Sequence, residues 1–77
     1  MKRREGCKGY VIVARSYELK DGGFSAEFSV EEHDSDGVME TEFYLSNTFS
    51  TQEAAIEAGV KAGRRRIDEG FERGSVA

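Results

Sequence analysis

The chain has 77 residues, of which 38% are hydrophobic, and it contains a single cysteine. A chain of this length forms one small domain, in which a deep catalytic cleft is hard to build. The lone Cys7 excludes an internal disulfide, so support for so small a core is expected from a metal or from a partner subunit. We favour the partner subunit, and these totals predict a non-enzymatic protein without a cofactor.

The net charge of −4 is unevenly distributed along the chain. Residues 1–17 carry five bases and one acid, residues 18–57 carry one base and eleven acids, and residues 58–77 carry five bases and three acids. The molecule is therefore acidic in its middle and basic at both ends. Either kind of segment is a surface that a macromolecule of opposite charge would bind.

The N-terminus shows no targeting signal. Lys2, Arg3 and Arg4 make a basic start, but the apolar run at residues 10–14 is too short and too late for a signal-peptide core. No stretch approaches the roughly 20 apolar residues of a membrane-spanning helix. Because an unpaired thiol is typical of a reducing compartment, we expect a cytoplasmic protein with no membrane partner.

The first elements follow from composition. Residues 1–8 are polar and charged, and we expect a flexible basic tail there. The run YVIVARSYEL after Gly9 is dense in β-branched and aromatic residues, which predicts a strand with apolar groups on both faces. Gly22 and Gly23 follow it and accept the positive φ that a tight hairpin needs.

Two further strands are indicated by alternation. Apolar side chains at positions 24, 26, 28 and 30 alternate with polar ones, which is the period of a strand with one buried face. A third strand is expected at residues 38–45, with Thr41 and Phe43 on one side. The exposed face would then carry four acids: Glu27, Glu31, Glu40 and Glu42.

The segment at residues 49–71 has the marks of a helix. Ser50 followed by Glu53 fits a capping box, and Gly70 is a plausible helix end. Gly59 and Gly63 each cost about 1 kcal/mol in a helix, which close packing against the sheet would explain. One helical face repeats at steps of three and four: Gln52, Ile56, Val60, Gly63, Ile67 and Phe71.

These elements predict an α+β domain of order β-β-β-α. We expect a three-stranded antiparallel meander with one C-terminal helix packed on one face. The domain would span residues 9–71, between the flexible basic tail at residues 1–8 and a second flexible tail at residues 72–77.

The acidic stretch EEHDSDG at residues 31–37 is the best candidate for a metal site. With Gly37 at the sixth position of a calcium-binding loop, Asp34 and Asp36 occupy the third and fifth positions, where ligands are expected. Phe43, however, takes the twelfth position, which requires a bidentate glutamate. His33 and the distant Cys7 do not form a spaced zinc ligand set. We therefore interpret the stretch as a hairpin connection, with a weak cation site at Asp34 and Asp36 as the alternative.

Clustered bases at KAGRRRID favour a second function, nucleic-acid binding. Arginines neutralise phosphate and make forked contacts, but three successive arginines fan around a helix and cannot all face one ligand. The acids expected on the exposed sheet face would repel a phosphate backbone. The residues predicted for this function are Lys61, Arg64, Arg65, Lys2, Arg3 and Arg4.

A resemblance is carried by the element order and by the helix that opens FSTQEAAIEAG and closes RRRID. The chain resembles small uncharacterised bacterial β-β-β-α proteins, a likeness that implies a fold and no functional motif. The order also is similar to the C-terminal part of double-stranded RNA-binding domains, which place lysines at the start of the last helix. Here that position holds Gln52, Glu53 and Glu57, a departure that argues against duplex RNA binding.

One helix covers only one face of such a sheet, so the other face needs an explanation. An edge strand with apolar groups on both sides invites pairing, and a twofold dimer is the simplest solution, although a monomer with scattered surface apolar groups is the alternative. No nucleophile is paired with a base, so no catalytic residue is predicted. The residues predicted for self-association are Tyr10, Ile12, Val38 and Tyr44.

Overall fold

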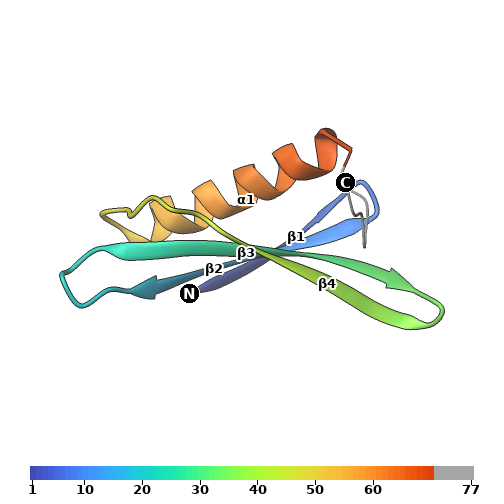
Figure 1. Cartoon of the computed structure of the whole chain (residues 1–77), viewed down its shortest axis with the longest axis horizontal. Helices are drawn as coiled ribbons and strands as arrows, with labels where there is room; N and C mark the ends of the chain where they lie inside the picture. The colour runs from blue at the N-terminus through green and yellow to red at the C-terminus, as the bar shows by residue number, and fades with distance from the viewer. Residues whose placement is uncertain (71–77) are drawn as a thin grey trace.

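The computed structural model describes residues 1–70 and consists of a twisted antiparallel sheet with one helix across it (Figure 1). The strands are β1 at Lys2–Cys7, β2 at Tyr10–Glu18, β3 at Phe24–Asp34 and β4 at Gly37–Tyr44, and the helix α1 spans Gln52–Asp68. Each strand pairs with the next along the chain, in the order β1-β2-β3-β4. The α+β class and the single C-terminal helix are confirmed.

The number of strands differs from the prediction. The sheet has four strands and not three, because residues expected in a loose tail form β1 and pair with β2 from Lys2↔Arg15 to Cys7↔Tyr10. Lys8 and Gly9, with φ of 50° and 87°, close a two-residue turn between them. Two positive φ values are what a tight hairpin turn of this length requires. The charged sequence of β1 hid it from a search for apolar alternation.

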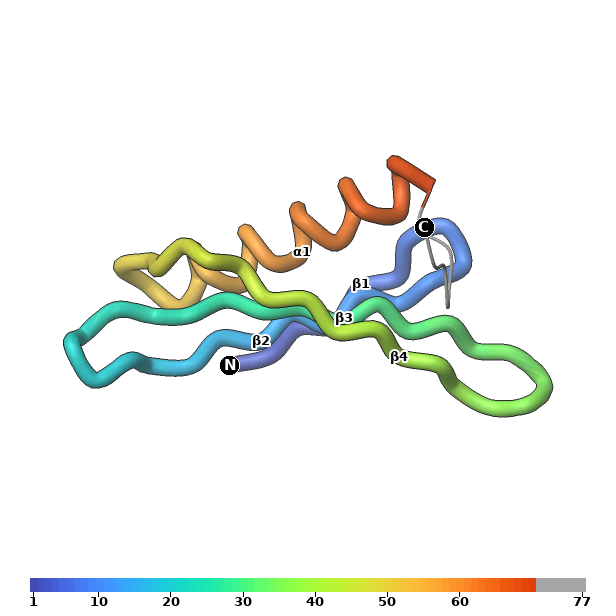
Figure 2. The backbone as a smooth tube through the Cα atoms, viewed as in Figure 1, coloured from blue at the N-terminus to red at the C-terminus, as the bar shows by residue number. Residues whose placement is uncertain are grey.

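The acidic stretch lies in the hairpin that joins β3 and β4. Pairing begins at Asp34↔Gly37, so only Ser35 and Asp36 lie between the strands. The Asp34 carboxylate accepts a hydrogen bond of 2.9 Å from the Asp36 amide, and Gly37 has a φ of 132°. The acidic stretch therefore forms a hairpin, although its first residues continue the strand. Figure 2 shows this hairpin extending away from the helix.

The N-cap of the helix lies one residue later than predicted. Thr51, and not Ser50, is the N-cap, and its hydroxyl accepts a hydrogen bond of 3.0 Å from the Ala54 amide. The end at Gly70 is confirmed: its φ is 93° and its amide donates to the Ile67 carbonyl at 3.1 Å. No helix in residues 1–70 is long and apolar enough to cross a membrane.

The core lies between α1 and the two inner strands. Ile12 and Ile56 are both 0% exposed, and Phe28 stacks on Phe43 with ring centroids 4.9 Å apart. A Cβ on Gly63 would lie 2.8 Å from the Ile12 Cγ2 atom, so the close packing predicted for the helical glycines is confirmed. The buried helical residues match the predicted face within the described part of the chain: Ala55, Ile56, Gly59, Val60, Gly63 and Ile67. The predicted Phe71 and the tail at residues 72–77 lie outside the described residues.

Candidate functional site

The face of the sheet opposite α1, here called the open face, carries many charged side chains. Its composition follows from the pairing register, because residues opposite each other on neighbouring strands share a face. Bases come from the first two strands and acids from the last two. The ionisable side chains on this open face are Lys2, Arg4, Arg15, Glu27, Glu31, His33, Glu40 and Glu42.

Two arginines of this face reach across neighbouring strands. Arg4 makes a two-pronged hydrogen bond to Glu31, with distances of 3.0 and 3.3 Å. Arg15 donates to the Ser29 hydroxyl at 2.9 Å and lies 3.8 Å from Glu40. Although no helix in the described part of the chain covers them, Val13 is 1% exposed and Ser29 is 0% exposed. The centre of the open face is therefore covered by these ion pairs, whereas Val38 and Tyr44 remain exposed farther out on the same face.

Glu31 is the centre of this ionic cover. Hydrogen bonds from Arg4 and then from His33, whose Nε2 atom lies 3.0 Å away, hold the pKa of the Glu31 carboxyl below its ordinary value of 4.5. The group is thus charged through the physiological range. On β4 the nearby Glu42 carboxylate, to which Tyr44 donates at 3.2 Å, raises the pKa of the Tyr44 phenol. Negative charge is concentrated on the β4 side.

The residues predicted for self-association are divided between the two faces. Ile12 is part of the core under α1, and Tyr10 packs half-buried against that core. Their expected place on the open face is wrong, because Val11 and Val13 take that side of β2. The sequence could not distinguish the two because apolar residues occupy both faces of this strand. Val38 and Tyr44 do lie on the open face, 54% and 73% exposed.

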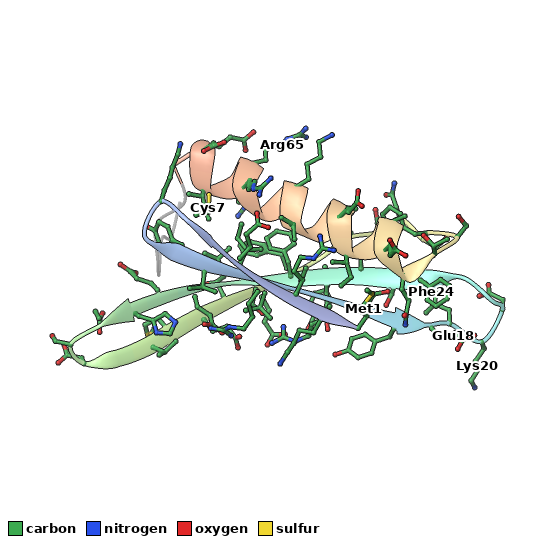
Figure 3. The ribbon with its side chains drawn as sticks, turned by 180° about the vertical axis from the view of Figure 1, so that it is seen from behind. Met1, Cys7, Glu18, Lys20, Phe24 and Arg65 are labelled. Carbon is green, nitrogen blue, oxygen red and sulfur yellow. The ribbon has the colours of Figure 1, made fainter. Side chains whose placement is uncertain are left out.

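The outer edges of the sheet are β1 and β4, and no other strand of residues 1–70 pairs with either. The edge once expected at β2 is therefore occupied by β1. On β1, Cys7 sits half-buried against the core near the last turns of the helix (Figure 3). On β4, most side chains are exposed and the charged ones are Glu40 and Glu42.

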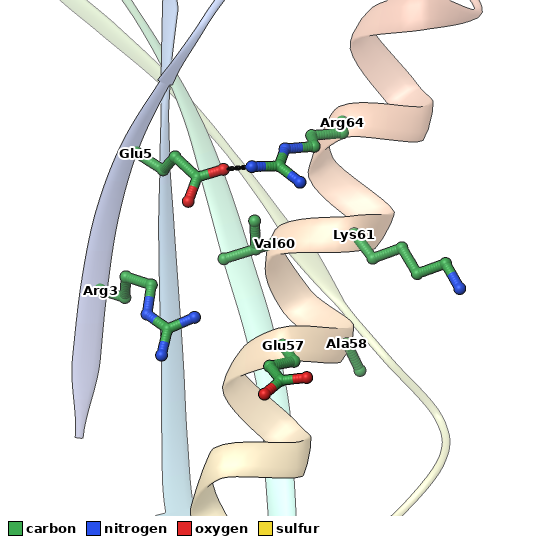
Figure 4. Close-up of a pocket in the computed structure, with 7 residues that line it drawn as sticks. All are labelled: Arg3, Glu5, Glu57, Ala58, Val60, Lys61 and Arg64. Atoms are coloured by element: carbon green, nitrogen blue, oxygen red, sulfur yellow. Dashed lines mark hydrogen bonds and ion pairs between the residues drawn. The ribbon is translucent and has the colours of Figure 1, made fainter.

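A cleft of about 430 Å³ lies between β1 and α1 (Figure 4). It exists because α1 packs mainly on β2 and β3 and leaves β1 largely uncovered. Arg64 on the helix forms an ion pair with Glu5 on β1. Arg3 and Glu57 extend into the cleft from opposite sides, and Lys61 points away from β1. Arg3 has no ion-pair partner among the residues that the structure describes.

The bases predicted for nucleic-acid binding are not gathered on one surface. Arg3, Lys61 and Arg64 line the cleft, whereas Lys2 and Arg4 lie on the open face. Arg65 is exposed on the helix and does not line the cleft. Acids accompany the cleft bases, since Glu5 and Glu57 line the same space. The cleft is thus a site of mixed charge.

Two functional positions were missed from the sequence. Glu5 was assigned to a tail, so neither its pairing with Arg64 nor its place beside the cleft was expected. Arg15 was counted only toward the charge of its segment, although it caps Ser29. The Lys8-Gly9 pair would have signalled a hairpin, and a strand at residues 2–7 would have followed from it. Within residues 1–70, no group of three or more histidine, cysteine or acidic side chains is arranged to hold a metal.

Comparison with known proteins identifies a family and does not identify a function. No curated protein and no solved structure matches the chain. A family described as a domain of unknown function, DUF6566, matches residues 1–77, the whole chain. This agrees with the resemblance to small uncharacterised proteins that carry no functional motif. The chain belongs to the DUF6566 family.

Proposed function

We propose that this domain is a non-enzymatic interaction module that associates with a second copy of itself through the outer edge of β1. The observation that carries the proposal is that β1 offers six residues of strand with no partner on its outer side within residues 1–70. An unpaired edge presents a row of backbone donors and acceptors that another strand can satisfy. The helix covers one face and ion pairs cover the centre of the other, which leaves the sheet edges and the exposed ends of the open face as surfaces that could bind.

The two edges differ in how well they accept a copy of themselves. β4 carries Glu40 and Glu42 on one face, so an antiparallel β4 pair places carboxylates close to carboxylates. β1 carries both signs, with Arg3 and Glu5 two residues apart on the side of the cleft. Opposite charges across paired strands favour association and like charges oppose it. β1 has a net charge of +2 and β4 of −2, so the advantage of β1 is that its Arg3 and Glu5 can form opposite-charge pairs with a second copy.

The ionic cover of the open face supports an edge contact over a face-to-face one. Burying Arg4, Arg15 and their carboxylate partners under a second sheet would remove water from ion pairs that are partly exposed. That desolvation cost commonly exceeds the attraction gained. Association at the edge of β1 leaves these ion pairs in contact with water.

The test is the mass of the protein by size-exclusion chromatography with light scattering. We expect a dimer, twice the 8.6 kDa of the chain, at high concentration. Arg4→Pro should give a monomer, because proline removes an edge donor, while Arg4→Ala should remain dimeric. Both variants lose the ion pair to Glu31, so they differ in the outward amide and in the φ restriction that proline adds. A wild-type monomer at every concentration would refute the proposal.

A second candidate function, nucleic-acid binding, is favoured by the three bases that line the cleft. Arg3, Lys61 and Arg64 come from two elements yet border one space. The expected signature is a gel shift with single-stranded oligonucleotide that weakens steeply with added salt. Lys61→Glu should abolish it by reversing the charge of a base that lines the cleft. The same change should leave self-association intact, because this side chain points away from β1. Absence of any shift at low salt removes this candidate.

A further inference from the structure

The backbone of β1 divides into groups that face β2 and groups that face outward. In an antiparallel pair closed by a two-residue turn, the residues flanking the turn exchange hydrogen bonds, and bonded residues then alternate along the strand. Cys7 and Tyr10 flank this turn. The Ser16 amide donates to the Met1 carbonyl at 3.1 Å, which fits the same alternation. The residues with outward amides and carbonyls are Lys2, Arg4 and Gly6.

Three antiparallel registers between two copies of β1 join at least two outward residues of each strand and keep both helices on the same side of the joined sheet. They centre the twofold axis on Arg3, on Arg4 or on Glu5. In each case directly opposed residues differ by an even number of positions in the sequence, so their side chains lie on the same face of the joined sheet. The axis at Arg4 joins all three outward residues of each copy, as Arg4↔Arg4 and twice as Lys2↔Gly6. The other two registers use only two outward residues of each strand. Backbone hydrogen bonding therefore favours the axis at Arg4.

Side-chain charge selects the same register. With the axis at Arg4, Arg3 of each copy lies opposite Glu5 of the other, on the side of the cleft. An axis at Arg3 sets Arg3 against itself, and an axis at Glu5 sets Glu5 against itself. The remaining like-charge contact, Arg4 against Arg4, is offset because each is already paired with Glu31 at 3.0 Å. Cross-strand pairs of opposite charge stabilise and like pairs destabilise.

We infer that two copies of the chain join their β1 strands antiparallel about a twofold axis at Arg4, with Arg3 of each copy paired to Glu5 of the other. This inference rests on the proposed self-association and adds its register. Arg3 thereby gains the partner that it lacks within residues 1–70. Two four-stranded sheets become one continuous sheet, and the two clefts meet above the joined strands.

Disulfide trapping measures the register directly. In a Cys7→Ser background, each of Arg3→Cys, Arg4→Cys and Glu5→Cys is oxidised alone and resolved without reductant. Directly opposed residues on antiparallel strands lie about 4.5–5.5 Å apart at Cα, within the range of a disulfide. We expect rapid dimer formation by Arg4→Cys alone, and a heterodimer when Arg3→Cys and Glu5→Cys proteins are mixed. Faster self-linking by Arg3→Cys or by Glu5→Cys would overturn the register.

Charge exchange tests the pairing of Arg3 with Glu5 of the second copy. Arg3→Glu and Glu5→Arg should each raise the dimer dissociation constant about tenfold, and the combined variant should return to within about threefold of wild type. Lys20→Glu, a similar reversal at the distant turn after β2, should leave it unchanged. Thermal unfolding of each variant separates weakened pairing from loss of fold, because Glu5→Arg also loses the ion pair with Arg64.

The outcomes separate this inference from the proposal beneath it. A wild-type dimer by light scattering without trapping by Arg4→Cys, or without recovery in the combined charge exchange, would overturn the register and leave self-association standing. A wild-type protein that is monomeric at every concentration would overturn both. A dimer that is trapped by Arg4→Cys and restored by charge exchange supports both.

Discussion

Both faces of the sheet contain buried residues, but these residues are protected from water by different means. Under α1, Ile12 and Ile56 are fully buried by apolar contacts with a helix that two glycines bring close. On the open face, Val13 and Ser29 are just as buried, although no element within residues 1–70 lies over them. There the cover consists of Arg4 and the other long ionic side chains that cross the strands. Long charged side chains shield apolar surface with their stems while their heads stay in water.

This difference affects which surfaces of the domain are suited to binding. A face with an apolar surface left bare would attract a second layer, whereas a face with an ionic cover loses hydration when another protein buries it. The unsatisfied positions that remain are backbone groups at the edges of the sheet. The stability of the two covers, and their dependence on pH and packing, are therefore the first things to measure.

The largest expected effect is on the helix side. Ile56→Ala removes a fully buried side chain between α1 and the sheet, and such changes cost about 2–5 kcal/mol. A core of this size supplies only about 3–5 kcal/mol in total, so we expect much of the protein to be unfolded. Val13→Ala, a truncation on the open face that removes two carbons where Ile56→Ala removes three, should cost about 1.5 kcal/mol. Urea unfolding followed by circular dichroism compares the two; equal losses would contradict the distinction.

The next effect tests how closely the helix approaches the sheet. Gly63→Ala gains about 1 kcal/mol of helix propensity but places a methyl group 2.8 Å from Ile12, and overpacking costs about 1–3 kcal/mol. We expect a net loss of unfolding free energy. Gly59→Ala, whose added carbon would lie 3.1 Å from the Ala14 Cβ atom, should lose less. A gain in stability for Gly63→Ala would show that the helix can move away at little cost.

A smaller effect measures the ionic cover. Arg15→Leu leaves the buried Ser29 hydroxyl without its 2.9 Å donor, and an unsatisfied buried group costs about 1–3 kcal/mol. We expect a loss near the lower end, because leucine keeps part of the apolar cover. In a Ser29→Ala background the same change should cost less, and this double-mutant cycle isolates the contact. Additive losses would mean that Arg15 does not stabilise through Ser29.

The smallest effect is the pH dependence of the open face. Because the pKa of Glu31 is held below 4.5, its ion pairs stabilise the fold fully above that value and are lost as the pH falls through the lowered pKa. Glu31→Gln should reduce the unfolding free energy by about 0.5 kcal/mol at pH 7 and by less at pH 3. Thermal unfolding at both pH values provides the measurement. An equal reduction at the two values would contradict a role for the charge.

Much of the fold could be predicted because its signals are local. Phe28 and its neighbours on β3 alternate with polar residues, and that alternation fixed both the strand and the face that meets the helix. The helical face around Ile56 and Val60 follows from spacing alone. β1 escaped prediction because an edge strand buries little and carries charge, as sequences of edge strands commonly do.

The prediction of the candidate site depended on which alternate residues of β2 face the helix, and the sequence of β2 does not determine this. Ile12 and Val13 are both apolar, and each fits either face. Only pairing with β1 and β3 places Ile12 under α1 and Val13 under the arginines. Once β1 is present, β2 ceases to be an edge and the surface available for pairing moves to Arg3, Arg4 and Glu5. Because one strand was not predicted, the free edge of the sheet was expected at β2 and not at β1.

The most direct test of the central claim is hydrogen exchange of the edge amides, followed by NMR at high and low protein concentration. The account predicts that the Arg4 amide, which faces outward on β1, is protected at high concentration and exchanges freely on dilution. The Glu40 and Glu42 amides, which face outward on β4, should exchange freely at both. Free exchange of the Arg4 amide in a sample that light scattering shows to be dimeric would contradict association through β1.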